Sequence, residues 1–391
     1  MSAPWRQLSP RMIELSNAVR SRVAMNDQFP FLNRAVLDQI LLHAIEIGAS
    51  DVDFFNDQPV WLQVEGYRHP INQRSFSTSE LRHIADTIYG GSASTILAQG
   101  KSLNPGYEVR VDRTRSERFR VNIVQHDADG GAGLQITMRH IRPEIPRLEK
   151  LNIEPELIVN LMSDNGMMAI TGPTGSGKST LMASIVQEDL LDPMAHRKYL
   201  FGEQPIEFLL RKIPGATTLV SQMEIGRDIP SFEAFVEEAM RRKPEVIVVG
   251  ECKNRATMAA SIDASNSGHF TCTTMHTKTV ADTVRRAINF FPADERDGAA
   301  LDFIGNARVI VNQILVPGAD GKRRAAREFL VFTPEVRELM SETPLSLWPE
   351  KLRKITAEQG QPMSVALQRL VETGEVLPDM IPQFTQLREA A

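Results

Sequence analysis

The sequence is poor in cysteine and contains no long hydrophobic run. Its two cysteines, Cys252 and Cys272, stand in apolar surroundings outside any C-x-x-C pair, so no structural zinc site is indicated and a cytoplasmic location fits. No apolar stretch approaches the ~18–20 residues that span a bilayer, and the first ten residues lack a signal-peptide core. We therefore expect no direct membrane insertion, and any recruitment to a membrane would come through a partner.

An excess of positive charge is also missing. The net charge is −5, which disfavours a protein built mainly to coat nucleic acid, and no nucleic-acid partner is expected. What is present is the composition of an ordinary soluble globular protein, with 42% hydrophobic and 24% charged residues. The 391 residues allow two or three domains, because a single core usually stops growing at roughly 250–300 residues.

The stretch Gly172–Thr180 is a glycine-rich loop between an apolar run and a helix-like segment. It matches G-x-x-x-x-G-K-[ST] in the strand, loop and helix order of a phosphate-binding loop. Its glycines let backbone N–H groups turn toward a polyphosphate, Lys178 supplies a positive charge, and Ser179 supplies a hydroxyl for Mg²⁺. A turn that merely starts a helix is the alternative, and it leaves the acidic motif downstream unexplained.

This loop predicts ATP and Mg²⁺ as the cofactors. The residues expected to bind the nucleotide are Gly172, Pro173, Thr174, Gly175, Ser176, Gly177, Lys178, Ser179 and Thr180.

The first third of the chain is typical of a small α+β domain. A helical apolar face follows the cap residue Asn33, and strand-like segments follow it. We place an N-terminal extension of unassigned role at 1–34, this domain at 35–140 and a linker at 141–150, where Pro143 and Pro146 disfavour regular structure.

Strands alternate with helices in the rest of the chain. This order predicts an α/β domain over 151–335 with a doubly wound sheet and ligands at the carboxyl ends of its strands. The continuous apolar run Val246–Val249 is typical of a strand buried on both faces. A helical C-terminal tail is expected over 336–391.

Hydrolysis of a bound nucleotide requires a group that orients or deprotonates water. Glu251 follows the run Val246–Val249 and one glycine, so we expect it beside the phosphate loop as the catalytic base. Glu203 and Glu207 follow another predicted strand. Glu203 is a candidate to hold Mg²⁺ through a water or to fix the attacking water, and a surface pair is the alternative for both carboxylates.

His269 and His276 stand at the two ends of an apolar stretch. One histidine in such a place is more often a structural hydrogen-bonding residue. Because this stretch is expected to be the strand beside the one that leads to Glu251, both histidines are candidates to sense or contact the γ-phosphate. Zinc binding by the two is not expected, because no third ligand is apparent.

The four motifs together resemble those of the type II/type IV secretion ATPase superfamily. The matching segments are Gly172–Thr180 (Walker A), Glu203–Phe208 (Asp box), Val246–Glu251 (Walker B) and Ser267–Thr277 (His box). Flanking segments resemble the pilus-retraction, PilT-type branch as well. These are Ile47–Asp51, Arg118–Asn122 and Pro334–Leu339.

The resemblance implies an N-terminal PAS-like domain and a C-terminal RecA-like P-loop NTPase domain in a homo-hexameric ring. In that family ATP is clamped between the two domains, and arginines of the N-terminal domain complete the site. Arg118 and Arg120 are the candidates here, with salt bridges on a strand face as an equal alternative. The resemblance also implies a cytoplasmic ATPase recruited to inner-membrane components of a transport machine.

Several residues depart from the pilus-retraction pattern. Gln204 stands where the Asp box has a second acid, and Lys253 and Asn254 stand where the family has Arg and Asp. A point charge replaces a bidentate guanidinium at Lys253. With the chain length and the missing tetracysteine motif of assembly motors, these departures favour the DotB/TraJ-type ATPases of type IVB secretion and conjugation systems. A type IV pilus retraction motor is the alternative.

Two functions of other kinds stay open. The departures at Gln204, Lys253 and Asn254 motivate a docking scaffold that nucleotide binding orders without productive hydrolysis. A RecA-like nucleic-acid motor is the other, and the acidic net charge and the lack of a basic, aromatic stripe oppose it.

Overall fold

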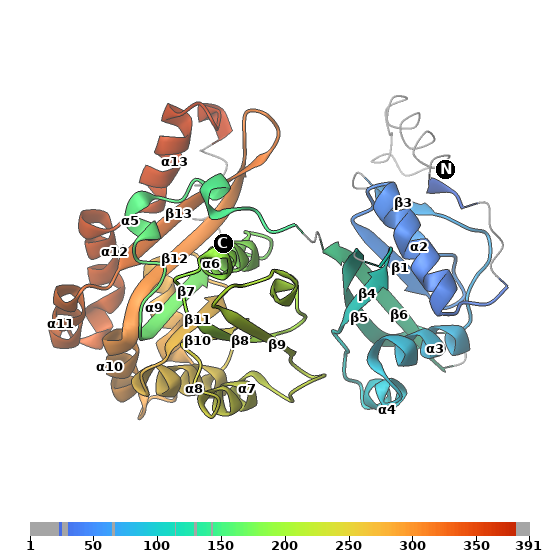
Figure 1. Ribbon diagram of the computed structural model, residues 1–391, viewed down its shortest axis with the longest axis horizontal. Helices are drawn as coiled ribbons and strands as arrows, with labels where there is room; N and C mark the ends of the chain where they lie inside the picture. The colour runs from blue at the N-terminus through green and yellow to red at the C-terminus, as the bar shows by residue number, and fades with distance from the viewer. Residues whose placement is uncertain are drawn as a thin grey trace, which may run out of the picture. The chain divides into compact units, whose positions relative to one another are not determined.

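The computed structural model describes residues 23–25, 30–64, 67–113, 115–128, 131–141 and 144–380. Most of the predicted extension, residues 1–22 and 26–29, lies outside the described residues. The chain divides into two compact units, 1–143 and 144–391, drawn from blue to red in Figure 1. The division falls inside the segment 141–150 that was predicted as a linker, and the domain ranges themselves stay predictions.

The N-terminal unit is built on a six-stranded sheet in the order β3-β2-β1-β6-β5-β4, with antiparallel neighbours throughout. Its helices and strands are α2 (Arg34–Glu46), β1 (Asp51–Phe55), β2 (Trp61–Val64), β3 (Tyr67–Pro70), α3 (Thr78–Tyr89), α4 (Ala93–Ala98), β4 (Gly106–Arg110), β5 (Ser116–Ala128) and β6 (Gly131–Ile141). Side chains from both the helices and the strands form one hydrophobic core.

The cap predicted at the start of the first described long helix is confirmed. The side chain of Asn33 accepts a hydrogen bond from the N–H of Val36 at 3.0 Å, and Leu37 and Ile40 on the predicted apolar face are fully buried. Gly48, with φ of 74°, follows the helix in the left-handed conformation that ends it.

The C-terminal unit contains a seven-stranded sheet in the order β13-β12-β7-β11-β10-β8-β9, parallel except for the edge strand β13. Its strands are β7 (Gly166–Thr171), β8 (Lys198–Glu203), β9 (Leu219–Glu224), β10 (Val246–Val249), β11 (Phe270–Met275), β12 (Ala307–Pro317) and β13 (Arg323–Val331). The α-helices are α5 (Pro155–Ile158), α6 (Lys178–Leu191), α7 (Phe232–Met240), α8 (Arg255–Asn266), α9 (Val280–Asn289), α10 (Arg296–Asn306), α11 (Pro334–Glu342), α12 (Trp348–Gln359) and α13 (Met363–Glu372).

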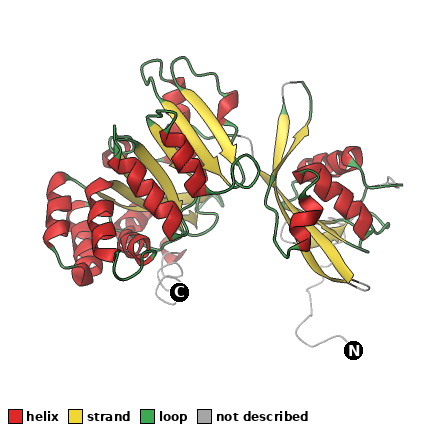
Figure 2. Ribbon diagram, turned by 90° about the horizontal axis from the view of Figure 1, so that it is seen from below, coloured by secondary structure: helices red, strands yellow, loops and turns green. Residues whose placement is uncertain are grey.

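Hydrophobic side chains leave this sheet on both faces. Met168 and Ile170 of β7 pack with residues of α6, whereas Met167 and Ala169 pack with residues of α8, α9 and α10. Successive side chains of a strand point to opposite faces, so β7 is buried between two layers of helices, and helices flank the strands in Figure 2. The predicted doubly wound sheet is confirmed.

The helices after residue 333 pack on this sheet. Trp348 and Leu352 of α12 are buried in the core that contains β7, and Met363 of α13 packs with Ala326 of β13. Helices were predicted in this part of the chain, but α12 and α13 share their cores with the sheet. Residues 381–391 of the predicted tail lie outside the described residues.

Cys252 and Cys272 are both buried and free in the C-terminal unit. Burial raises the pKa of the Cys252 thiol to about 12, and burial also raises the pKa of the Cys272 thiol. No helix in the described part of the chain is long and apolar enough to cross a membrane.

Glu80 is a buried carboxylate at the start of α3 that accepts several hydrogen bonds. It accepts hydrogen bonds from the N–H groups of Leu32 and Ser77 at 3.0 Å and from the guanidinium of Arg74 at 2.9 Å. Burial opposes ionisation of this carboxyl, but these donors outweigh it and lower the pKa of Glu80 below 4.5.

We predict that Glu80→Gln lowers the free energy of unfolding by about 1–3 kcal/mol at neutral pH, because a charged acceptor is lost. The folded-state pKa lies below the unfolded value of 4.5, so the contribution is present above that pH and is lost as the pH falls through the folded-state pKa. Urea unfolding at neutral pH and at about pH 3 measures both effects. Glu46→Gln, at an exposed position, is the control. If the loss of unfolding free energy in Glu80→Gln is as large at about pH 3 as at neutral pH, the lowered pKa of Glu80 is contradicted.

Candidate functional site

The phosphate loop joins the end of β7 to the start of α6. Gly172, Gly175 and Gly177 have φ values of 141°, 76° and 83°, in the region that favours glycine. A Cβ atom on Gly172 would lie 2.1 Å from the carbonyl oxygen of Gln313, so the close approach of loop and strand also requires glycine. The N–H groups in the first turn of α6 therefore follow a loop whose path requires glycine, and a helix N-terminus of this kind favours binding of an anion.

Lys178 is the first residue of α6 and lies folded over the loop. Its ammonium donates hydrogen bonds to the carbonyl oxygens of Gly172 and Pro173, both at 2.9 Å, and its side chain is mostly buried. Burial lowers the pKa of Lys178, although the negative charges of Glu251 and Glu207 act in the opposite direction. A partly desolvated cation in this place is poised to exchange carbonyl contacts for phosphate oxygens.

Glu251 follows β10 and reaches the same edge of the sheet. One carboxylate oxygen lies 3.3 Å from Nζ of Lys253 and the other 3.5 Å from Nε2 of His276. The strands β7, β11 and β10 are neighbours and parallel, so their carboxyl ends present the loop, His276 and Glu251 side by side. The structure thus brings Lys178, Glu251 and His276 together, and their catalytic roles stay predictions.

The two predicted histidines lie at opposite ends of β11. His276 follows the strand, whereas His269 precedes it, and the six strand residues between them span roughly 20 Å. The Nδ1 atom of His269 is 2.8 Å from the carbonyl oxygen of Pro244, before β10. His269 therefore lies away from Lys178, Glu251 and His276. The prediction that grouped it with His276 was wrong because the two ends of one strand face opposite edges of the sheet.

Ser179 and Glu203 line one small cavity of about 30 Å³ beside the loop. The side chain of Gln222, on β9, donates to a carboxylate oxygen of Glu203 at 2.9 Å and to the carbonyl oxygen of Phe208 at 2.7 Å, which orients the carboxylate. Mg²⁺ typically takes one or two protein oxygens and fills its other positions with water and phosphate. This hydroxyl and carboxylate fit that donor set. No group of three potential metal-ligating side chains occurs among the described residues.

Sequence reasoning missed two buried amides on β12. Asn312 donates to the hydroxyl of Thr171 and to the carbonyl oxygen of Thr277, both at 2.9 Å, and Gln313 donates to the carbonyl oxygen of Ser176 at 2.6 Å. They connect the strand before the loop, the loop itself and the segment after His276. The signal was available, because two adjacent amides interrupt an apolar run and a buried amide needs partners.

Arg118 and Arg120 belong to β5 in the N-terminal unit. Arg118 is 7% exposed and lies 3.7 Å from the carboxylate of Glu108 on β4, while Arg120 is exposed and pairs in register with Arg139 of β6. Arg118 thus makes an ion pair with the neighbouring strand, and the part of both arginines in a nucleotide site stays a prediction.

The family described as type II/IV secretion system protein matches residues 26–356. The chain belongs to this family. A type II/IV secretion ATPase of the PilT-like kind was predicted from the four motifs, and this prediction is confirmed.

Solved and curated relatives of this type II/IV secretion family member cover nearly the whole chain. The X-ray structure of the ATPase DotB of Legionella pneumophila has a TM-score of 0.86 and 36% identity, over 93% of this chain and 98% of that one. The pilus retraction motor PilT with bound ADP has a TM-score of 0.74 and 25% identity, over 88% of this chain and 95% of that one. The type IV pilus ATPase PilU of Pseudomonas aeruginosa is 29% identical over 342 residues, 87% of this chain and 86% of the relative.

These likenesses confirm the predicted fold class, an N-terminal α+β domain followed by a RecA-like ATPase domain. The matches cover most of this chain and most of each relative, so the likeness extends over both domains and is not limited to the phosphate loop.

The pKa of His276 depends on the charged side chains around the loop. Burial and the positive charge of Lys178 lower its pKa below 6.5, Glu251 acts in the opposite direction, and Arg286 lowers it further. The imidazole is therefore neutral at neutral pH, which suits a group that accepts or donates one hydrogen bond without adding charge.

We predict opposite shifts of the His276 pKa in two variants. Lys178→Met should raise it, because a nearby positive charge is removed, and Glu251→Gln should lower it, because a negative charge is removed. Histidine NMR signals followed against pH, with His276→Gln for assignment, measure both shifts. Lys253→Met is the control, since Lys253 contacts Glu251 and not the ring. Shifts of the same sign in the two test variants would remove His276 from this cluster.

Proposed function

We propose that the chain is a Mg²⁺-dependent ATPase that acts as a homo-hexamer and powers a type IVB secretion or conjugation apparatus. The observation that carries the proposal is the convergence of Lys178, Glu251 and His276 beside a glycine-shaped phosphate loop. The likeness to DotB over 98% of that chain supports the same conclusion.

The chemistry follows from the side chains at the edge of the sheet. The loop N–H groups and Lys178 would hold the β- and γ-phosphates, with Mg²⁺ carried by Ser179 and, through water, by Glu203, where it would neutralise phosphate charge. Glu251 would orient the attacking water and accept its proton, and His276, already 3.5 Å from Glu251, would contact the γ-phosphate side. Arg118 and Arg120 are proposed to complete the site from the domain at 35–140.

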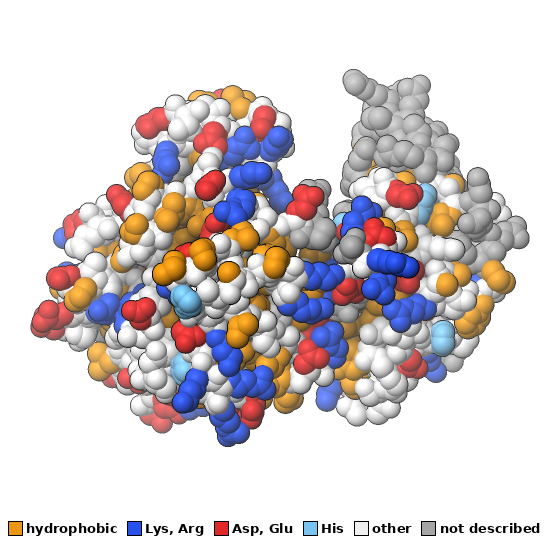
Figure 3. All heavy atoms as spheres, viewed as in Figure 1, with side chains coloured by type: hydrophobic (Ala, Val, Ile, Leu, Met, Phe, Trp, Pro, Cys, Tyr) orange, Lys and Arg blue, Asp and Glu red, His pale blue; other side chains and the backbone are white. Residues whose placement is uncertain are grey.

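Hydrolysis would then drive motion of the N-terminal domain against the RecA-like domain at 151–335, through the linker at 141–150. We propose a cytoplasmic location, with the ring recruited to inner-membrane components of the machine rather than inserted itself. A nucleic-acid track is not part of the proposal. On the face drawn in Figure 3, acidic side chains appear among the basic ones across the C-terminal unit.

Retraction of a type IV pilus is the second candidate. It is favoured by the likeness to the pilus retraction motor PilT and to the type IV pilus ATPase PilU. Both candidates share the ATPase cycle and differ in the membrane machine that receives the work.

We predict that Lys178→Ala abolishes ATP binding, because the buried cation over the loop is lost, and that Glu251→Gln binds ATP but lowers turnover about 10²–10⁴-fold, because the base is lost. Phosphate release and equilibrium ATP binding measure the two effects separately. His269→Gln, at the far end of β11, is the matched control and should keep turnover close to that of the wild type. Undiminished phosphate release by Glu251→Gln would refute the catalytic assignment.

A cellular test separates motor, scaffold and machine. In a host deleted for this chain, we expect the wild-type protein to restore protein or DNA transfer and Glu251→Gln to fail, because hydrolysis supplies the work. Transfer assays and surface motility are measured in parallel. Restoration of motility alone favours the pilus candidate, and full complementation by Glu251→Gln favours a docking scaffold.

A further inference from the structure

Arg327 is a buried cation in the C-terminal unit that the proposed chemistry does not use. It lies on β13, is 1% exposed and is the largest fully buried side chain of the described residues. Burial lowers its pKa, and the charge of Glu154 partly offsets this. A guanidinium so far from water must be held by specific acceptors.

Each nitrogen of the guanidinium has an acceptor. Nε donates to Oε1 of Gln313 at 2.8 Å, one terminal nitrogen donates to the carbonyl oxygen of Leu151 at 2.9 Å, and the other donates to the carbonyl oxygen of Asn152 at 3.1 Å. The same nitrogen lies 3.5 Å from the carboxylate of Glu154. One arginine thus joins β12, β13 and the segment that enters the domain.

The contact with Gln313 has a direction. A guanidinium can only donate, so the amide oxygen of Gln313 must face Arg327 and the amide NH₂ group must face away from it. That NH₂ group donates to the carbonyl oxygen of Ser176, inside the phosphate loop, at 2.6 Å. The charge on Arg327 therefore selects the orientation of Gln313 that the loop needs.

Gln313 also sets the path of the loop by contact. A Cβ on Gly172 would meet its carbonyl oxygen at 2.1 Å, and a Cβ on Gly177 would lie 3.0 Å from its side-chain nitrogen. The first and last glycines of the loop are thus packed against this one residue. A rotation of the amide would place an oxygen against the Ser176 carbonyl oxygen and push the loop away.

We propose that Arg327 is a positioning residue of the nucleotide site, which fixes the orientation of Gln313 and, through it, the shape of the phosphate loop. The inference rests on the proposed ATPase function and concerns how tightly the loop holds a nucleotide.

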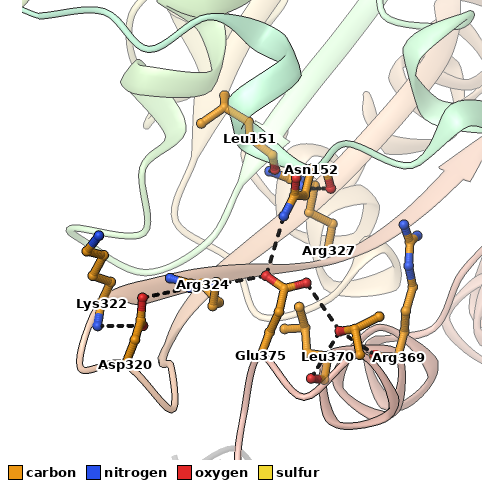
Figure 4. Close-up of polar contacts among 10 residues, drawn as sticks. Leu151, Asn152, Asp320, Lys322, Arg324, Arg327, Arg369, Leu370 and Glu375 are labelled. Atoms are coloured by element: carbon orange, nitrogen blue, oxygen red, sulfur yellow. Dashed lines mark hydrogen bonds and ion pairs between the residues drawn. The ribbon is translucent and has the colours of Figure 1, made fainter.

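The C-terminal helices contribute to this arrangement. Gln361, between α12 and α13, donates to the carbonyl oxygen of Arg327 at 2.8 Å and to the carboxylate of Glu154 at 3.0 Å. After α13, Glu375 accepts from Arg324 at 3.0 Å and from the side chain of Asn152 at 3.4 Å, and Figure 4 shows Asn152 and Arg327 next to each other above Glu375. The segment 361–375 therefore contacts Glu154 and Asn152, two of the residues that bind the Arg327 guanidinium.

The test compares Arg327→Lys and Gln313→Leu with the matched control Arg323→Lys, all in the full-length protein. Arg323 is the first residue of the same strand and is exposed. The probe is methylanthraniloyl-ADP, with affinity read from fluorescence and folding from thermal unfolding. We expect Arg327→Lys and Gln313→Leu to weaken binding about tenfold or more, and Arg323→Lys to change it less than about twofold.

The double variant Arg327→Lys/Gln313→Leu supplies a readout that a merely structural role does not move. If Arg327 acts through Gln313, the double variant should bind no more weakly than Gln313→Leu alone, although it unfolds at a lower temperature. Additive losses of affinity, or wild-type affinity in folded Arg327→Lys, would overturn the proposal. Should Arg327→Lys not fold, wild-type affinity in Gln313→Leu overturns it and weakened affinity supports it. Absence of binding by the wild type instead refutes the proposed function.

Discussion

The contact between the phosphate loop and β12 is the constraint on which the C-terminal unit depends. Gly172 passes so close to the Gln313 carbonyl that no side chain fits between them. The side-chain amide of Gln313 also donates a hydrogen bond to the carbonyl oxygen of Ser176 in the loop. The loop is thus shaped by its neighbouring strand as much as by its own glycines. The position of β12 therefore limits the paths that the loop can take.

The parallel order of the central strands places the chemistry. Because β7, β11 and β10 are neighbours that run in one direction, three segments far apart in the sequence end at one edge. Lys178 and Glu251 meet there with His276 between two charges of opposite sign. The next strand, β8, ends at the same edge with Glu203, and Gln222 of the edge strand β9 fixes the orientation of that carboxylate.

The sequence alone predicted what is local. Caps and periodicity located the helix that begins after Asn33, and glycine spacing located the phosphate loop, because both depend on residues adjacent in the chain. The separation of His269 from His276 required the direction of a strand within a sheet. The role of Arg327 could not be predicted without knowing that β13 pairs with β12 and that β12 pairs with the strand before the loop. In the sequence, β13 is about 150 residues away from the loop. The contact of Gln222 with Glu203 likewise depends on the pairing of β9 with β8.

The two buried thiols have a practical consequence for labelling experiments. The thiolate is the form that attacks maleimides and disulfides, and burial keeps Cys252 and Cys272 in the thiol form and away from solvent. The chain is therefore a natural cysteine-light background. Pairs of cysteines introduced on exposed positions of the two domains can carry spectroscopic labels without removal of the native ones, so distances between the domains can be recorded with and without added nucleotide in an otherwise unaltered protein.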